Sequence, residues 1–144
     1  MAEQQLKELI SSLKDQGILD DYIDEVKSLQ DENNPHLLKN LITPFFTRIE
    51  EIIAELTTNL SEADVNYSRV GHLSYRNKGS AASLGCARLA NVAQELSDAS
   101  AAQNKEECLM LVDNLKSEYY VVKPHLNRIA ELESAIYENQ QAGE

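Results

Sequence analysis

The sequence predicts an all-α protein, an antiparallel four-helix bundle preceded by two short N-terminal helices. Apolar residues recur at spacings of three and four along most of the chain, and no useful stretch alternates apolar and polar residues as a strand does. Only 5 Gly and 3 Pro occur among 144 residues, which argues against an all-β fold with many tight turns. Apolar residues make up 42% of the chain, enough for one sizeable core. Residues 1–144 are therefore expected to form a single domain, with its core at about residues 16–138.

The N-terminal part is expected to form the two short helices. Four apolar residues between Leu6 and Leu13 share one helix face, and Gly17 follows where a helix commonly ends. A second helix is expected from Asp20, because Asp20 and Asp21 suit the positive end of a helix dipole. Its apolar face holds Tyr22, Ile23, Val26 and Leu29.

The third helix is expected to open at Asn33-Asn34-Pro35. Asn is a good N-cap, and Pro is tolerated at the first helical position because its missing N–H would be unbonded there. An apolar stripe then continues from Leu38 to Leu60 over about six turns. Pro44 lies inside this helix and predicts a bend or a loosened turn.

Three more helices complete the predicted bundle. The spacing within Ser61–Asp64 resembles a capping box and is expected to start the fourth helix, which ends near Ser83. The fifth helix is expected over residues 87–99. The sixth begins at Asn104, whose side chain can cap it, and its apolar stripe passes Pro124, where a bend is expected.

The charge of the chain excludes several classes of partner. Lys and Arg number 13 and Asp and Glu number 24, so the formal net charge is −11. Such an acidic chain repels phosphate backbones and anionic lipid, and we expect neither a nucleic-acid nor a membrane partner. No signal-peptide pattern or long apolar run occurs, which favours an intracellular protein. Cys86 and Cys108 form no CxxC or disulfide framework and are expected to be buried, reduced thiols.

The residues contain no catalytic or metal-binding motif. His36, His72 and His125 are far apart in the sequence, and none has the spacing of a zinc or di-iron site. The GxSxG, GxxxxGK[ST] and GxGxxG motifs are all missing. We therefore expect no enzyme activity, no cofactor and no metal ion.

The segment Tyr75–Cys86 is unusual for a plain bundle because it places Gly79 inside an amphipathic helix. A glycine there costs about 1 kcal/mol relative to alanine. One explanation is that Gly79 permits close helix packing. The other is that Gly79 keeps a surface flat, so that another protein can reach Tyr75 one turn earlier.

The run Lys78-Gly79-Ser80-Ala81-Ala82-Ser83-Leu84-Gly85 resembles the KGSxxSxG signature of histidine-containing phosphotransfer (HPt) proteins. The resemblance is greatest to the plant proteins that relay phosphoryl groups in cytokinin signalling. It extends to residues 16–20, to residues 29–35 and to Phe45-Phe46, and covers roughly Gln16 to Ile136. It implies an HPt-like helical bundle that acts in a two-component phosphorelay.

One departure from the family decides the function that the resemblance implies. The phosphorylated histidine of the family falls on Tyr75, the following Gln on Arg76, and the next apolar residue on Asn77. Plant variants without the acceptor histidine are called pseudo-phosphotransfer proteins and inhibit the pathway. A phenol with a pKa of about 10 stays protonated at neutral pH, and its phosphate ester is too stable to pass the group on. Tyr75 is therefore expected to keep a similar shape without relaying.

The resemblance implies that the partners are receiver domains of hybrid histidine kinases and response regulators, bound by a monomer in the cytoplasm and nucleus. The expected docking face combines apolar contact area from the N-terminal helices with the charge of Lys78. Its residues are Tyr75, Arg76, Lys78, Gly79, Ser80, Ile18, Leu19, Tyr22 and Ile23. Two alternatives remain: an active carrier that uses another residue such as His72, or a helical adaptor unrelated to phosphorelay.

Overall fold

The computed structural model describes residues 1–29 and 36–142, with side chains described through Glu138. Within these ranges the chain forms six helices and no strand, which confirms the predicted all-α class. The helices are α1 Ala2–Asp15, α2 Tyr22–Lys27, α3 Leu37–Leu60, α4 Tyr67–Ser83, α5 Ala87–Ala101 and α6 Lys105–Ala142. In the described ranges no helix has the length and apolar character needed to cross a membrane.

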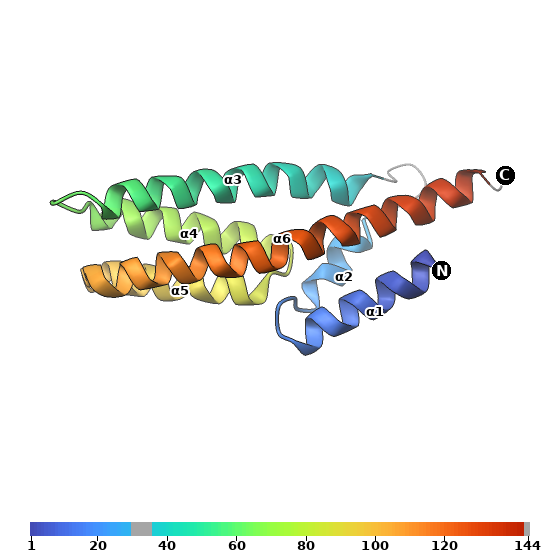
Figure 1. The fold of residues 1–144 in the computed structure, drawn as a ribbon, viewed down its shortest axis with the longest axis horizontal. Coiled ribbons are helices and arrows are strands. Elements are labelled where there is room, and N and C mark those ends of the chain that lie inside the picture. The colour runs from blue at the N-terminus through green and yellow to red at the C-terminus, as the bar shows by residue number, and fades with distance from the viewer. Residues whose placement is uncertain (30–35, 143–144) are drawn as a thin grey trace.

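Helices α3 to α6 form the four-helix bundle. α4 packs against α3 and α5, and α6 packs against the same two helices, so each helix has two neighbours. α3 and α6 are the long pair in Figure 1, whereas α4 and α5 line only one half of the molecule. α1 packs on the half of α6 that extends past α4 and α5, with α2 close by. The two N-terminal helices thus cover one end, as the sequence predicts.

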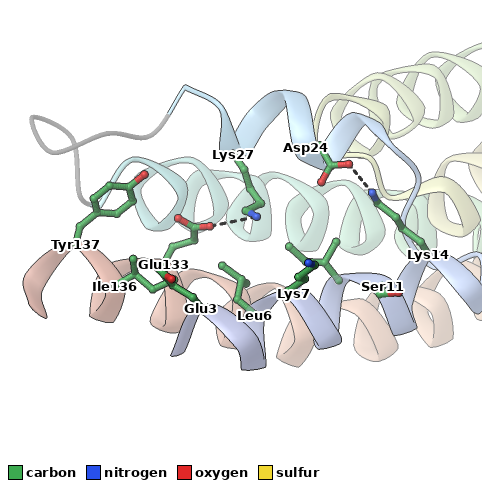
Figure 2. A pocket seen from close by; sticks show the side chains of 11 residues that line it. Glu3, Leu6, Lys7, Ser11, Lys14, Asp24, Lys27, Glu133, Ile136 and Tyr137 are labelled. Carbon is green, nitrogen blue, oxygen red and sulfur yellow. Dashed lines mark hydrogen bonds and ion pairs between the residues drawn. The ribbon is translucent and has the colours of Figure 1, made fainter. Parts of the chain in front are cut away.

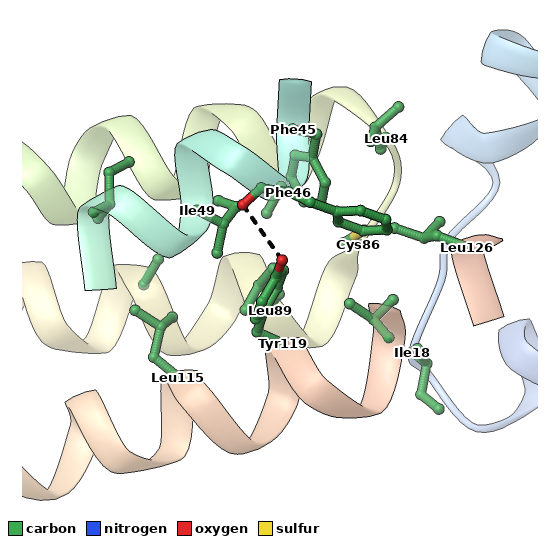
Figure 3. Packing of buried hydrophobic residues seen from close by; sticks show 14 of the residues in the cluster. Ile18, Phe45, Phe46, Ile49, Leu84, Cys86, Leu89, Leu115, Tyr119 and Leu126 are labelled. Atoms are coloured by element: carbon green, nitrogen blue, oxygen red, sulfur yellow. Dashed lines mark hydrogen bonds between the residues drawn. The ribbon is translucent and has the colours of Figure 1, made fainter. Parts of the chain in front are cut away.

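The centre of the core is formed where α3, α5 and α6 meet (Figure 3). Tyr119 of α6 is fully buried, and its ring meets the edge of Phe46 at a centroid distance of 6.0 Å. Its hydroxyl donates hydrogen bonds to the Phe46 carbonyl (3.3 Å) and to Glu50 Oε2 (2.7 Å), so this buried polar group is satisfied. Cys86 and Cys108 are free and buried, as predicted, and burial raises the pKa of Cys86 to about 12.

Gly17 ends α1 in the way that the sequence predicts. Its φ of +74° lies in the left-handed region, which glycine adopts without steric cost. The Gly17 N–H donates to the Lys14 carbonyl, and the Ile18 N–H donates to the Leu13 carbonyl, each at 3.0 Å. These two bonds form a Schellman motif, which satisfies carbonyls of the last helical turn and turns the chain toward α2.

Gly85 fastens the turn between α1 and α2 to the bundle. Its φ is +73°, and its carbonyl accepts a hydrogen bond from the Asp20 N–H at 2.9 Å. A Cβ at Gly85 would lie 2.9 Å from the Ile23 backbone nitrogen, so a larger residue would separate the two segments. The Asp20 carboxylate also accepts a hydrogen bond from the Tyr22 N–H (2.9 Å). Tyr22 is therefore held next to the C-terminal end of α4.

The predicted start of the fourth helix at Ser61–Asp64 is wrong. The Ser61 hydroxyl donates to the Thr58 carbonyl (2.6 Å) and so belongs to the end of α3. The N-cap of α4 is Asn66, whose side chain accepts a hydrogen bond from the Arg69 N–H at 3.1 Å. Asn59 of α3 holds Asn66 in place through two 3.1 Å hydrogen bonds to its backbone. The local sequence pattern at Ser61–Asp64 gives no sign of this contact across the loop.

The end of the fourth helix near Ser83 is confirmed, whereas the bends expected at Pro44 and Pro124 stay predictions. Asn104 caps α6 as predicted, since its Oδ1 accepts a hydrogen bond from the Glu107 N–H at 3.2 Å. Pro44 and Pro124 lie inside α3 and α6. The predicted N-cap at residues 33–35 lies outside the described residues.

Candidate functional site

The solvent-facing side of α4 carries a stripe of residues at helical spacing. His72, Tyr75, Arg76 and Gly79 are all exposed, and Tyr75 keeps 72% of its surface accessible. α4 is anchored to α3 by a bidentate pair in which the Arg69 guanidinium donates to Glu55 at 2.8 and 2.9 Å. The stripe is therefore displayed on a helix that is fixed at its N-terminal end.

Gly79 opens the surface rather than allowing close packing. A Cβ built at this position would meet no atom within 4 Å, so the packing explanation for this glycine is wrong. Gly71 on the same helix differs, because its Cβ would lie 3.0 Å from the Ser100 hydroxyl of α5. The surface one turn after Tyr75 is thus flat without any requirement from the core.

Lys78 does not face the same way as the exposed stripe. Its ammonium donates a 2.6 Å hydrogen bond to the Gln94 side chain of α5, and the residue is half-buried. Arg76 is exposed, and no ion pair or hydrogen bond joins its guanidinium to another described residue. The cation that is available beside Tyr75 is therefore Arg76, whereas the sequence assigned this role to Lys78.

Several residues of the predicted docking face are buried instead. Ile18, Leu19 and Ile23 keep 3%, 2% and 0% of their surface, so the prediction that they supply exposed contact area is wrong. The reason is the turn at Gly85, which folds the α1–α2 segment into the core. Ser80 is also buried, at 8% exposure.

Ser80 faces α3, where the Arg48 guanidinium lies 3.4 Å from its hydroxyl. Tyr22 differs from its buried neighbours on α2, because 51% of its surface is exposed. The residues of the predicted face that remain at the surface are Tyr75, Arg76, Gly79 and Tyr22, with Lys78 at its edge.

The segment that forms α4 and the first half of α5 has a charge opposite to that of the whole chain. Residues 65–94 contain no Asp or Glu but include four Lys and Arg, in a chain whose net charge is −11. Arg69 pairs with Glu55 and Arg88 pairs with Glu118 (2.6 Å). The net charge of the whole chain hides this acid-free segment, because it is a single sum over all residues. Counting charge by segment would have found it.

Asn77 lies on the inner side of α4, between the exposed residues Arg76 and Gly79. It is completely buried, and neither its Nδ2 nor its Oδ1 has a hydrogen-bond partner among the described residues. An unsatisfied buried amide costs about 1–3 kcal/mol. The core behind the exposed stripe is therefore weakened at this turn.

The three histidines do not form a site together. His72 is exposed on the α4 stripe, one turn before Tyr75. His36 contacts α6, with Nδ1 2.9 Å from the Ser134 hydroxyl and Nε2 3.5 Å from Glu138. In the described part of the chain, no three His, Cys, Asp or Glu side chains are grouped so that they could hold a metal ion.

A pocket of about 520 Å³ lies between α1, α2 and α6, away from the α4 stripe (Figure 2). Two ion pairs lie in it: Lys27 is 3.5 Å from the buried Glu133, and Lys14 pairs with Asp24. Burial raises the pKa of Glu133 above its ordinary value. These pairs connect α2 to α1 and to α6, and so help to fix the helix that carries Tyr22.

The Hpt domain family model matches residues 40–135, which include all of α4 and α5. The chain belongs to the Hpt domain family. It is 31% identical to histidine-containing phosphotransfer protein 1 of Arabidopsis thaliana, with 93% of this chain and 87% of the relative covered. It is also 28% identical to pseudo histidine-containing phosphotransfer protein 6 of Arabidopsis thaliana, with 89% and 84% covered.

Among solved structures, the histidine-containing phosphotransfer protein MtHPt2 from Medicago truncatula is similar to this Hpt domain protein with a TM-score of 0.86. The two chains are 29% identical, and the match covers 99% of this chain and 95% of the other. Relatives with and without "pseudo" in their names therefore match nearly the whole bundle.

Proposed function

We propose that this Hpt domain protein binds receiver domains of a phosphorelay without relaying the phosphoryl group, and so inhibits the pathway. The observation that supports this best is Tyr75, which is 72% exposed where the resemblance places the acceptor histidine. The proposed setting is cytokinin-type signalling in the cytoplasm and nucleus, with the protein acting as a monomer. Its partners would be receivers of hybrid histidine kinases and response regulators.

The chemistry of the side chain supports a block at the transfer step. A histidine relay needs a neutral imidazole nitrogen that attacks the phosphoaspartate and later releases the phosphoryl group. The phenol of Tyr75 is a weaker nucleophile toward the phosphoaspartate than such an imidazole. A phosphate ester formed there would be too stable to return to an aspartate. The receiver supplies the aspartate and its divalent ion, so a relay protein contributes only the docking surface and the acceptor, and this chain would contribute the surface alone.

The remaining surface supports docking. Gly79 leaves open space beside Tyr75, and the positive α4 surface complements the acidic pocket that holds a receiver's aspartate. Tyr22 adds an exposed aromatic side chain near the C-terminal end of α4. A competitor that presents this surface would occupy the place of an active relay protein on the receiver.

An active carrier that uses His72 is the second candidate, because His72 is exposed on the same stripe. The residues three and four positions after it are Tyr75 and Arg76. For a carrier that used His72, these two large side chains would stand where Lys78 and the small Gly79 stand relative to Tyr75. Their bulk would obstruct the approach of a receiver to His72. The test below separates the two candidates.

The test mixes the protein with a receiver that carries radiolabelled phosphate on its aspartate. We expect binding without label transfer, and slower transfer from that receiver to an active relay protein added afterwards. Label on His72, His36 or His125 would overturn the proposal. Lack of binding to any receiver would favour an adaptor unrelated to phosphorelay.

Restoring the acceptor sharpens the same test. Tyr75→His should accept label measurably but slowly, because Arg76 adds bulk and the buried Asn77 puts an amide where the family has an apolar side chain. Adding Asn77→Leu should raise the rate. If the double variant binds the receiver but takes no label, more than the acceptor has been lost.

A further inference from the structure

The cations around α4 differ in whether another side chain already neutralises or orients them. Arg69 is held by Glu55, Arg88 by Glu118, and Lys78 donates to Gln94. The Arg76 guanidinium is exposed and has no such partner among the described residues. It follows Tyr75 directly and precedes Gly79 by three residues, so it borders the open surface.

We infer that Arg76 makes this surface prefer receivers whose aspartate is phosphorylated. The protein would then hold the phosphorylated receiver without removing its phosphoryl group. This inference rests on the proposed function, because it assumes that the α4 surface docks receivers. It adds a specificity-determining residue and a preferred state of the partner.

The charge of the two receiver states supports the preference. An aspartate carries one negative charge, whereas a phosphorylated side chain carries about −1.5 to −2 and three acceptor oxygens. An arginine side chain can bind two phosphate oxygens at once through its planar fork of N–H donors. An unpaired guanidinium at the docking surface therefore gains more from the phosphorylated state than from the free aspartate.

The neighbouring residues leave the bound phosphoryl group intact. The Tyr75 hydroxyl can donate a hydrogen bond to a phosphate oxygen, but a phenol is a poor nucleophile toward phosphorus. Arginine stays protonated and is no nucleophile. The inference therefore includes no covalent step: the bond between aspartate and phosphorus is neither formed nor broken in the complex.

The experiment compares the dissociation constants for a receiver with magnesium alone and with magnesium plus beryllofluoride, which mimics the aspartyl phosphate. For the unaltered chain we expect about tenfold tighter binding of the activated receiver, the effect of one charge-assisted contact. Arg76→Gln should lower this ratio to near one while binding to the unactivated receiver changes little. Arg76→Lys, which keeps the charge but not the fork, should give an intermediate ratio.

Arg69→Gln is the matched control, because it removes a cation of the same helix that already pairs with Glu55. It should leave the ratio unchanged. Inorganic phosphate at millimolar concentration should also leave it unchanged; loss of the ratio there would reveal a site for free phosphate and overturn the inference. Equal binding of both receiver states would overturn the inference but not the proposed function. Failure to bind either state would overturn both.

Discussion

Helices α3 and α4 lie side by side in the bundle but bury different kinds of residue. Every buried residue of α3 is apolar: Leu38, Ile42, Phe45, Phe46, Ile49, Ile52, Ile53, Leu56 and Leu60. Half of those of α4 are polar: its buried residues are Val70, Leu73, Ser74, Asn77, Ser80 and Ala81. α4 also contains Gly71 and Gly79, which lower its helix propensity.

The difference indicates that the two helices have different roles. α3 supplies apolar packing, and the buried Tyr119 hydroxyl beside it is satisfied by hydrogen bonds to the Phe46 carbonyl and Glu50. α4 carries the exposed stripe and contains Asn77, whose amide is unsatisfied among the described residues. Binding sites commonly contain residues that are not the most stabilising ones at their positions. The rest of the fold compensates for the lost stability.

The largest expected effect on stability is in α3. Ile49→Ala removes a fully buried side chain and should lower the free energy of unfolding by about 2–5 kcal/mol. Leu41→Ala, at a position of the same helix that is 39% exposed, is the control and should cost much less. Urea denaturation measures both. Similar losses in the two variants would contradict the assignment of α3 as the packing helix.

Gly79→Arg tests whether α4 serves binding, in contrast to the packing role of α3. The long side chain would fill the open surface beside Tyr75, and receiver binding should weaken about a hundredfold, as measured by titration calorimetry. The helix should not be destabilised, because arginine has a higher helix propensity than glycine by up to about 1 kcal/mol. Ala54→Arg, on the exposed side of α3, should bind as well as the unaltered chain. Unchanged binding by the Gly79 variant would show that receivers dock elsewhere.

Asn77→Leu should make the inner face of α4 more like that of α3. Removing the unsatisfied amide and adding apolar contacts is expected to raise the free energy of unfolding by about 1–2 kcal/mol. Asn91→Leu, at an exposed position of α5, should change it by less than about 0.5 kcal/mol. Thermal or urea unfolding can compare the two. A loss of stability in the Asn77 variant would mean that the amide has a structural role.

The smallest effect concerns the satisfied polar contact beside α3. The hydrogen bond from the Tyr119 hydroxyl, together with Lys123 nearby, lowers the pKa of Glu50 below its ordinary value of 4.5. This contribution to stability is fully present above pH 4.5 and disappears as the pH falls through the lowered pKa. Tyr119→Phe should therefore be less stable than the unaltered chain at pH 7, with a smaller difference near pH 3.

Urea unfolding at the two pH values tests this prediction, and Glu50→Gln is the matched variant because it removes the same titration. A difference between the unaltered chain and Tyr119→Phe that stays constant with pH would show that Glu50 is not coupled to Tyr119.

Local signals in the sequence were reliable where the structure depends on neighbouring residues. Gly17 and Asn104 end and cap helices as predicted, because a left-handed turn and a side-chain cap involve contacts within a few residues. The predicted helix start at Ser61 is wrong because Asn66 is the N-cap of α4, and Asn59 holds Asn66 in place across the loop. Of the predicted docking face, Tyr75, Arg76, Gly79 and Tyr22 remain exposed, whereas four residues of that face are buried.

The sequence by itself determined the helical class, which follows from residue periodicity. Through its resemblance to HPt proteins, it also indicated the segment that carries the candidate site and placed the expected acceptor position on Tyr75. Only the tertiary structure decided which side chains of that segment face solvent. Gln94 of α5 accepts the hydrogen bond of Lys78, Glu55 of α3 pairs with Arg69, and Arg76 is left available. The physical reason is that charge neutralisation and burial depend on the helix opposite, whose position no local pattern specifies.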